Sequence, residues 1–251
     1  MKNAVHAAAL TALACISLAP AVPALAGTAE YVFPATVEEG EKEVEFKTGT
    51  RKLRNGGGRE SEAILGFGMG VNRWWFTELS AKWHKEPGER HAFDAWEWEN
   101  RFQLTETGRY PVDVGFLLEI ERPRERSEGY ELRWGPLFQA EFGPRVVGNL
   151  NLLIEKNVRA DNAARAELGY QWQVRYRWHP EFEFGAQGFG EVGPWNHWVR
   201  TSEQSHRWGP ALFGEVKLGP THKLAWNAGL LFGLTDGSPR NQLRLQTEYE
   251  F

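Results

Sequence analysis

The sequence predicts an all-β protein: a closed, antiparallel, up-and-down transmembrane β-barrel of about twelve strands. Three observations support this prediction. Apolar and polar residues alternate with a period of two along most of the chain, as in strands with one face toward lipid and one toward a polar interior. Short and long connections between these segments also alternate. The chain ends, at Phe251, on another such segment with no polar tail.

Residues 1–26 are predicted to be a cleaved secretory signal peptide. Lys2 precedes an apolar run over about residues 7–19, and Ala24-Leu25-Ala26 forms an Ala-x-Ala cleavage site. The run is too short and too interrupted by proline to remain as a membrane-spanning helix. The single cysteine, Cys15, lies in this segment, so the mature chain is expected to have no disulfide and no cysteine-based metal site. Lipidation at Cys15 is the alternative.

The rest of the chain is predicted to form one domain. Residues 27–40 contain Gly, Pro and acidic residues and are expected to be an extended periplasmic lead-in, while residues 41–251 form the barrel. The chain carries 29 basic and 33 acidic side chains, which argues against a nucleic-acid partner. Its mean hydropathy is negative, which is compatible with a barrel because only every second strand residue faces lipid.

Twelve segments show the alternation, and each is long enough to cross a bilayer at a tilt. They lie at about residues 41–51, 61–71, 75–84, 96–104, 110–121, 130–142, 146–155, 165–178, 182–191, 208–218, 224–234 and 240–251. Their apolar faces carry, in order, Val44 and Phe46; Leu65, Phe67 and Met69; Trp75, Leu79 and Trp83; Trp96, Trp98 and Phe102; Val114, Phe116 and Ile120; Leu132, Trp134 and Phe138; Leu150, Leu152 and Ile154; Tyr170, Trp172 and Val174; Phe182 and Phe184; Trp208, Leu212 and Val216; Trp226, Leu230 and Phe232; and Leu243, Leu245 and Tyr249.

The first segment is the weakest of the twelve, and the eighth is the clearest. In the eighth, seven residues from Ala166 to Trp178 alternate with polar residues and one glycine, a register that no amphipathic helix produces. The second segment places Gly66, Gly68 and Gly70 on its less apolar face. Because they lack the Gly-x-Gly-x-x-Gly spacing and a following helix, they indicate crowding inside a curved sheet rather than a nucleotide loop.

The connections assign the two ends of the barrel. Turns of about two to five residues lie on one side and loops of about five to fourteen on the other, as in barrels with short periplasmic turns and longer outer loops. An even strand count then places both termini in the periplasm. Aromatic residues gather near the strand ends, where two interfacial belts would lie. The alternative is that they fill the core of a soluble β-sandwich.

The last segment, with apolar residues at alternate positions before Phe251, resembles the closing strand of bacterial outer-membrane β-barrels. This resemblance implies a Gram-negative outer-membrane location, contact with outer-membrane lipid, and recognition of the closing strand by the barrel-assembly machinery. Within that class, the glycine-rich second segment running into Gly70-Val71-Asn72-Arg73-Trp74, after Glu39-Gly40-Glu41, is similar to outer-membrane transporters associated with a phenol-degradation pathway. The narrower resemblance implies a transporter or channel of undefined substrate and supplies no catalytic residues.

The polar face of the strands is expected to line a narrow, charged lumen. The candidate pore-lining residues are Glu78, Lys82, Glu97, Glu99, Arg101, Glu119, Arg133, Gln139, Glu141, Gln171, Gln173, Arg175, Glu183, Gln187, Arg244 and Glu248. Glu97, Glu99, Arg175 and Arg244 are expected to form part of a constriction. The alternative is that these charges only pair across neighbouring strands. The pattern favours a passive porin-like channel for small polar solutes, and the mixed signs predict weak ion selectivity.

Two other function classes remain open. A non-conducting structural or surface-interaction barrel would use Trp195, His197 and Trp198 of the longest loop. An outer-membrane lipid-modifying enzyme would need a nucleophile and a base in contact. Ser80 and His84 lie four residues apart on one strand, too far along it to meet. No catalytic residue, cofactor or metal site is therefore predicted.

Overall fold

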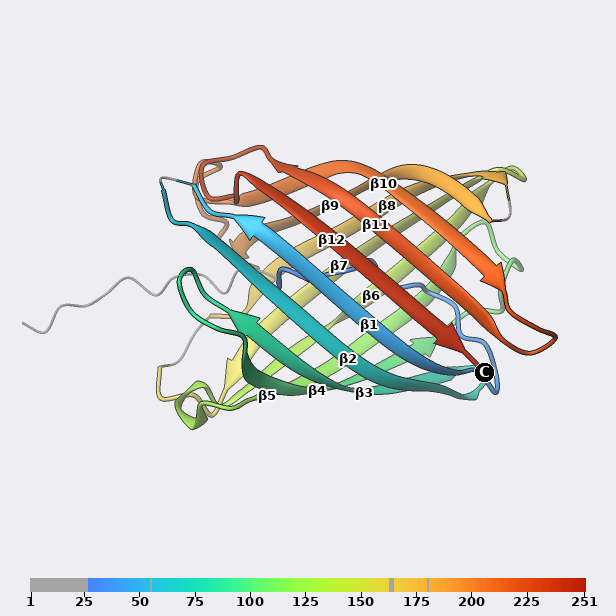
Figure 1. The fold of residues 1–251 in the computed structure, drawn as a ribbon, viewed down its shortest axis with the longest axis horizontal. Coiled ribbons are helices and arrows are strands. Elements are labelled where there is room, and N and C mark those ends of the chain that lie inside the picture. The colour runs from blue at the N-terminus through green and yellow to red at the C-terminus, as the bar shows by residue number, and fades with distance from the viewer. Residues whose placement is uncertain (1–26, 55, 163–164, 180) are drawn as a thin grey trace, which may run out of the picture.

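The structure is a computed structural model that describes residues 27–54, 56–162, 165–179 and 181–251, so the predicted signal peptide lies outside the described residues. Twelve antiparallel strands form a closed barrel in which β1 pairs with β12 (Figure 1). The strands are β1 Lys42–Lys52, β2 Arg59–Asn72, β3 Trp75–Lys85, β4 Ala92–Gln103, β5 Asp113–Pro123, β6 Tyr130–Phe142, β7 Val146–Val158, β8 Glu167–His179, β9 Phe182–Pro194, β10 Ser205–Lys217, β11 Lys223–Gly233 and β12 Asn241–Glu250. The predicted fold class is confirmed.

The two faces of each strand are sorted as the alternation predicts. In β1, Glu43, Glu45 and Lys47 are buried in the interior, while Val44 and Phe46 are exposed on the outside. The outer face of the whole barrel carries exposed large apolar side chains, whereas the interior is mostly polar. A single 3-10 turn, Arg126–Glu128, interrupts the strand pattern, and among the described residues no helix is long and apolar enough to cross a membrane.

One strand begins later than its sequence pattern predicts. The apolar alternation starts at Tyr110, but β5 begins at Asp113. The backbone N–H of Gly108, which has a positive φ of 70°, donates to the Asp113 carboxylate at 2.8 Å, and Arg109 N–H donates to the Glu106 carbonyl at 3.1 Å. These local bonds hold residues 104–112 in a turn, so the strand pattern extends beyond the strand.

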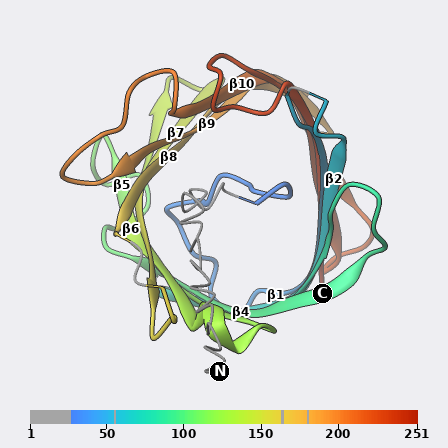
Figure 2. The same ribbon diagram turned by 90° about the vertical axis from the view of Figure 1, so that its left-hand side faces the viewer.

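Residues 27–40 do not form the extended periplasmic lead-in that the sequence suggested; they run inside the barrel. Figure 2 shows this segment crossing the lumen within the ring of strands. Every second residue of its central part, Tyr31, Phe33 and Ala35, is buried against apolar side chains of the wall. We call residues 27–40 the lumenal segment. Its burial is driven by the removal of these apolar side chains from water.

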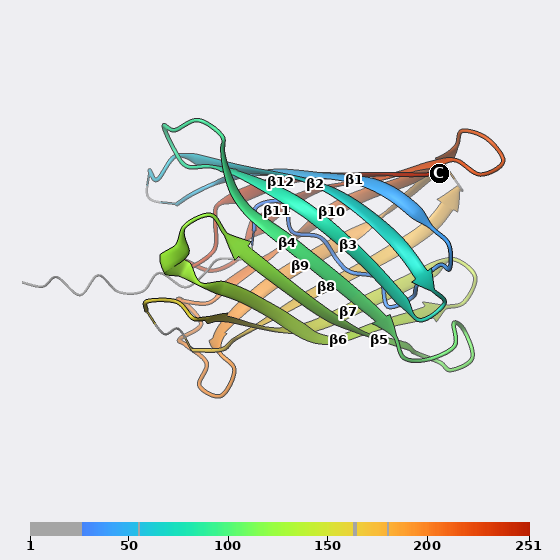
Figure 3. The ribbon, with the colours of Figure 1, turned by 90° about the horizontal axis from the view of Figure 1, so that it is seen from below.

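The lumenal segment runs from one end of the barrel to the other. The Gln242 amide, near the start of β12, donates to the Thr28 carbonyl at 2.7 Å. At the opposite end, Gly40 N–H donates to the Gly70 carbonyl at 2.9 Å, just before β1 begins. The first described residues therefore lie toward the end of the longer loops, and Phe251 lies at the other end (Figures 1 and 3). The even strand count predicted that both termini share one end.

Glycines on the inner face of the wall make room for the lumenal segment. A Cβ atom added to Gly49 would lie 1.9 Å from the Thr28 carbonyl oxygen, and one added to Gly70 would lie 1.9 Å from that of Glu38. Any larger residue at these two positions would displace the segment. Part of the glycine pattern in β2 is thus explained by a close approach of backbone to backbone.

Candidate lumenal site

The lumenal segment fills the interior along β4 to β7. The segment residues Tyr31, Phe33 and Ala35 form one apolar cluster with three wall residues, and these wall residues are Leu117, Leu137 and Leu153. The Asn151 amide donates to the Phe33 carbonyl at 3.1 Å, and the Tyr31 hydroxyl donates to the Glu99 carboxylate. The segment therefore packs against this side of the wall through both apolar and polar contacts.

Glu30 extends from the lumenal segment to the other side of the barrel. Its carboxylate accepts a hydrogen bond from the Gln171 amide of β8 at 2.9 Å and lies 3.1 Å from the Arg207 guanidinium of β10. Each of the twelve strands contributes at least one interior side chain that is at most 6% exposed. Examples, in strand order, are Lys47, Ile64, Ser80, Glu99, Leu117, Leu137, Asn151, Gln171, Gln187, Arg207, Leu231 and Arg244. The lumen is thus closely filled across its middle.

Most charges on the wall from β1 to β7 are paired with one another. Lys82 lies 2.5 Å from the Glu121 carboxylate, 3.5 Å from that of Glu97 and 3.7 Å from that of Glu62. Elsewhere in this wall Lys47 pairs with Glu45 and Glu78, Arg101 with Glu99, and Arg133 with Glu119 and Glu155. Buried charges are tolerated only when paired in this way. Seven candidate pore-lining residues belong to these networks: Glu78, Lys82, Glu97, Glu99, Arg101, Glu119 and Arg133.

The wall from β8 to β12 is different, because side-chain amides lie among its charges and a cavity opens beside it. Gln187 donates to Gln173 at 2.6 Å, Asn227 donates to Gln246 at 2.5 Å, and Arg244 donates to Asn227 at 2.7 Å. The cavity has a volume of about 450 Å³ and lies between this wall, the start of β1 and the lumenal segment, and it also reaches Arg101, Gln139 and Asn149 of β4, β6 and β7. It continues toward the C-terminal end as a second space of about 360 Å³, which shares Pro34, Glu41, Glu43, Arg101 and Glu248 with it.

The remaining candidate pore-lining residues fall into three groups. Gln139, Gln173, Arg175, Glu183 and Glu248 line the 450 Å³ cavity, as does Arg101 from the charged wall. Gln171, Gln187 and Arg244 are almost fully buried, where the interior is filled. Glu141 is largely exposed and pairs with Arg177 at 2.8 Å.

The four residues predicted to form part of a constriction are not all close together: carboxylate oxygens of Glu97 and Glu99 lie within 4.8 Å of each other, whereas Arg175 and Arg244 have other partners. Glu97 pairs with Lys82, Glu99 with Arg101, and Arg175 with Glu183 at 2.9 Å. Arg244 donates instead to the side-chain amides of Gln187 and Asn227. The structure therefore places these four side chains in the interior but does not join them in one ring.

Several residues of the site were missed from the sequence. Glu41 and Glu43 line the cavity, but they lie at the start of the weakest predicted strand. Tyr31 and Glu30 belong to the lumenal segment, which had no strand signal. A usable signal was present in Leu117 and Leu137, because an apolar residue on the polar face of a barrel strand indicates an apolar partner inside.

Among the described residues, Ser80 and His84 make no hydrogen bond with each other, so the enzyme hypothesis gains no support from this pair. The Ser80 hydroxyl donates to the Glu78 carboxylate at 2.7 Å and is 99% buried. A nucleophile also needs access to substrate, and the burial of Ser80 leaves it without that access in this arrangement.

No protein-family model matches the sequence, and no curated protein matches it either. Solved structures do match the fold. The COG4313 outer-membrane channel from Pseudomonas putida F1 superposes with a TM-score of 0.60 at 11% identity, covering 88% of this chain and 100% of that one. The NanC porin gives 0.57 at 11% identity over 83% and 100% of the two chains.

A third structure, the KdgM porin in complex with disordered oligogalacturonate, gives a TM-score of 0.54 at 10% identity over 83% of this chain and 99% of that one. At such identities the likeness concerns the fold alone. The narrower resemblance to transporters associated with phenol degradation stays a prediction. The chain has the fold of the small bacterial outer-membrane β-barrels.

Proposed function

We propose that the protein is an outer-membrane channel for small polar solutes, and that the structure describes a closed arrangement of it. The observation that carries the proposal is the 450 Å³ cavity, which lies inside a closed barrel and is lined mainly by charged and amide side chains. The path would enter from the C-terminal end and follow the wall from β8 to β12. It would be interrupted where Glu30 meets Gln171 and Arg207.

The apolar outer surface of the barrel supports a location in a lipid bilayer. Leu79, Phe142 and Trp178 are each more than half exposed there. Such a surface would be covered by lipid chains, because the closed sheet leaves no strand edge unpaired. In this proposal Phe251 and the start of β1 face the periplasm, and Phe251, which is itself exposed, is available to the barrel-assembly machinery.

The cavity lining favours cations and neutral solutes over anions. Seven carboxylates and three basic groups line it: Glu41, Glu43, Glu45, Glu183, Glu215, Glu248, Glu250, Arg101, Arg175 and Lys223. A lining of one predominant sign raises the local concentration of ions of the opposite sign. The mixed charges of the whole interior predicted weak selectivity, but most of the pairs lie outside the cavity. The KdgM complex contains oligogalacturonate, an anion, which this lining would disfavour.

Planar-bilayer recording tests the proposal. The expected result is a small conductance for the wild type and a larger one when Tyr31→Ala and Phe33→Ala loosen the lumenal segment. A salt gradient should give a reversal potential of the sign expected for cation preference. Folded, membrane-inserted protein that conducts in neither form would contradict the proposal.

A surface-interaction barrel is the second candidate, because the interior is closely filled and the loop over residues 195–204 exposes two aromatic side chains. Trp195 is 56% exposed and Trp198 is 60% exposed. Loss of cell-surface ligand binding in Trp195→Ala, with conductance absent in the wild type, would favour this candidate.

A further inference from the structure

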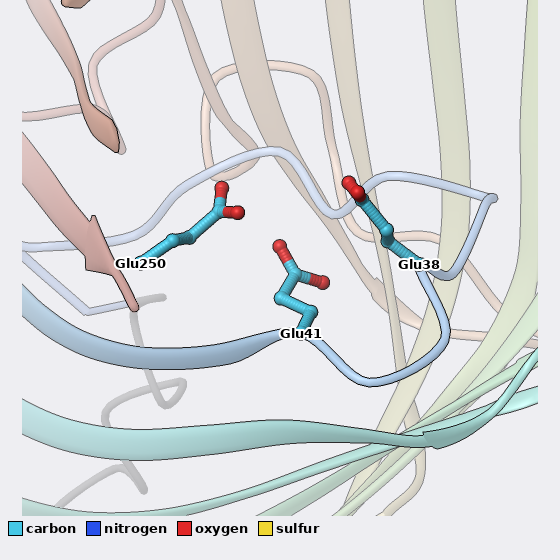
Figure 4. A group of neighbouring side chains, drawn as sticks. All are labelled: Glu38, Glu41 and Glu250. Carbon is cyan, nitrogen blue, oxygen red and sulfur yellow. The ribbon is translucent and has the colours of Figure 1, made fainter. Parts of the chain in front are cut away.

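Five carboxylates gather where the lumenal segment, β1 and β12 meet at the C-terminal end of the barrel. One carboxylate oxygen from each of Glu38, Glu41 and Glu250 lies within 4.8 Å of the others, and the same holds for Glu41, Glu43 and Glu248. Figure 4 shows the carboxylates of Glu41 and Glu250 pointing toward one another, with Glu38 on the neighbouring bend of the chain. Glu41 joins the two triads.

Glu43 is the most deeply buried member of this group, and like Glu41 and Glu248 it has no paired cation among the described residues. It is 97% buried and lines the 450 Å³ cavity, yet it makes no hydrogen bond or ion pair with any described residue. The charges of its neighbours on β1 and β12 are compensated, since Glu45 pairs with Lys47 at 2.7 Å and Glu250 pairs with Lys223 at 2.5 Å. An ionised carboxylate removed from water needs a compensating charge.

The oxygens of each triad lie within 4.8 Å of one another, which is close enough for one hard divalent cation to contact all three. The donors are all carboxylate oxygens, which suit Ca²⁺ or Mg²⁺ rather than metals that prefer nitrogen or sulfur. The cavity beside Glu43 has room for the waters that would complete a coordination shell of six to eight oxygens.

We propose that Glu41, Glu43 and Glu248 bind one divalent cation of the Ca²⁺ class, with Glu38 and Glu250 at the outer side of the site. The ion would join the end of the lumenal segment to β1 and β12, the two strands whose pairing closes the barrel. It would thereby fasten the segment inside the lumen. The proposal does not depend on conductance, so binding and transport can fail separately.

Calorimetric titration of Ca²⁺ into the folded barrel in a zwitterionic detergent at pH 8 tests the site. We compare the wild type with Glu43→Gln, Glu248→Gln and Glu41→Gln. The matched control is Glu106→Gln, an exposed acid in the turn 104–112 at the same end of the barrel. Folding of each variant is verified by heat-modifiable migration on mild SDS gels.

The expected result is one saturable site in the wild type and in Glu106→Gln, with an affinity at least tenfold lower in each of the three site variants. Ca²⁺ should also raise the unfolding temperature of the wild type but not of Glu43→Gln. Wild-type protein without saturable Ca²⁺ binding would overturn the proposal. Equal binding in all five proteins would overturn it too, because the ion would then sit elsewhere.

Discussion

The two sides of the lumen have opposite relations to the segment that crosses it. Along β4 to β7, Leu117, Leu137 and Leu153 pack directly against Tyr31 and Phe33, and the surrounding charges are paired. Along β8 to β12 the wall presents amides together with charged side chains, and a cavity separates much of it from the segment. Both walls show the alternation in sequence. The interior of this barrel is therefore determined by the segment that precedes β1 as much as by the strands.

Removal of the lumenal segment should abolish the difference between the two walls. We expect it to have the largest effect of the changes considered, an increase in conductance. Deletion of residues 28–38 would leave both walls facing water, so we expect the single-channel conductance to rise several-fold, as in barrels with an unfilled lumen. A variant with the outer loop residue Trp198→Ala should conduct like the wild type. A folded deletion protein with unchanged conductance would show that another element closes the lumen.

The stability of the barrel should depend strongly on the basic side chains of the wall from β1 to β7. Lys82→Gln would leave Glu62, Glu97 and Glu121 without their shared cation, and we expect a loss of about 3–5 kcal/mol in the free energy of unfolding. Urea unfolding of the protein in lipid vesicles measures this. Lys217→Gln, at the exposed end of β10, should unfold at the wild-type urea concentration. Equal midpoints for the two variants would indicate that the buried pairs are dispensable.

The apolar contact between the lumenal segment and the wall should contribute slightly less to the free energy of unfolding than the Lys82 network. Leu137→Ala removes a fully buried side chain from the cluster with Phe33, at an expected cost of about 2–4 kcal/mol. Leu212→Ala, which shortens a side chain on the outer face, should cost less because that residue is 42% exposed. The same urea titration compares them, and a larger loss for Leu212→Ala would contradict the described packing.

Substitutions in the cavity beside β8 to β12 should change ion selectivity rather than stability. This is the smallest of the expected effects. Glu248→Gln removes one cavity carboxylate, so we expect the cation-to-anion permeability ratio to fall by about twofold. Lowering the pH should act in the same direction. Because the pKa of Glu41 is raised to about 7, its charge is present at pH 8 and largely lost at pH 6. Reversal potentials in a KCl gradient measure both, and an increase at low pH would contradict the assignment.

The strands and their faces were predictable because lipid imposes a strict rule on every second residue. That rule states which side chains face inward and nothing about what they meet there. The pattern Tyr31, Phe33 and Ala35 is too short to be told from ordinary extended chain, so its burial was not predicted. The constriction stays a prediction. Strands are staggered around a barrel, so positions that look equivalent along the sequence, such as Glu97 and Arg244, contact different partners.

The bond from Gln242 to the Thr28 carbonyl has a consequence for biogenesis. It joins the last strand of the chain to residues that precede the first strand, right beside the seam where β1 and β12 meet. The barrel wall closes around the lumenal segment, and the contact of this segment with β12 holds β12 near the edge of β1. This contact within one chain favours pairing of β12 with the chain's own β1 over pairing with a strand of another chain.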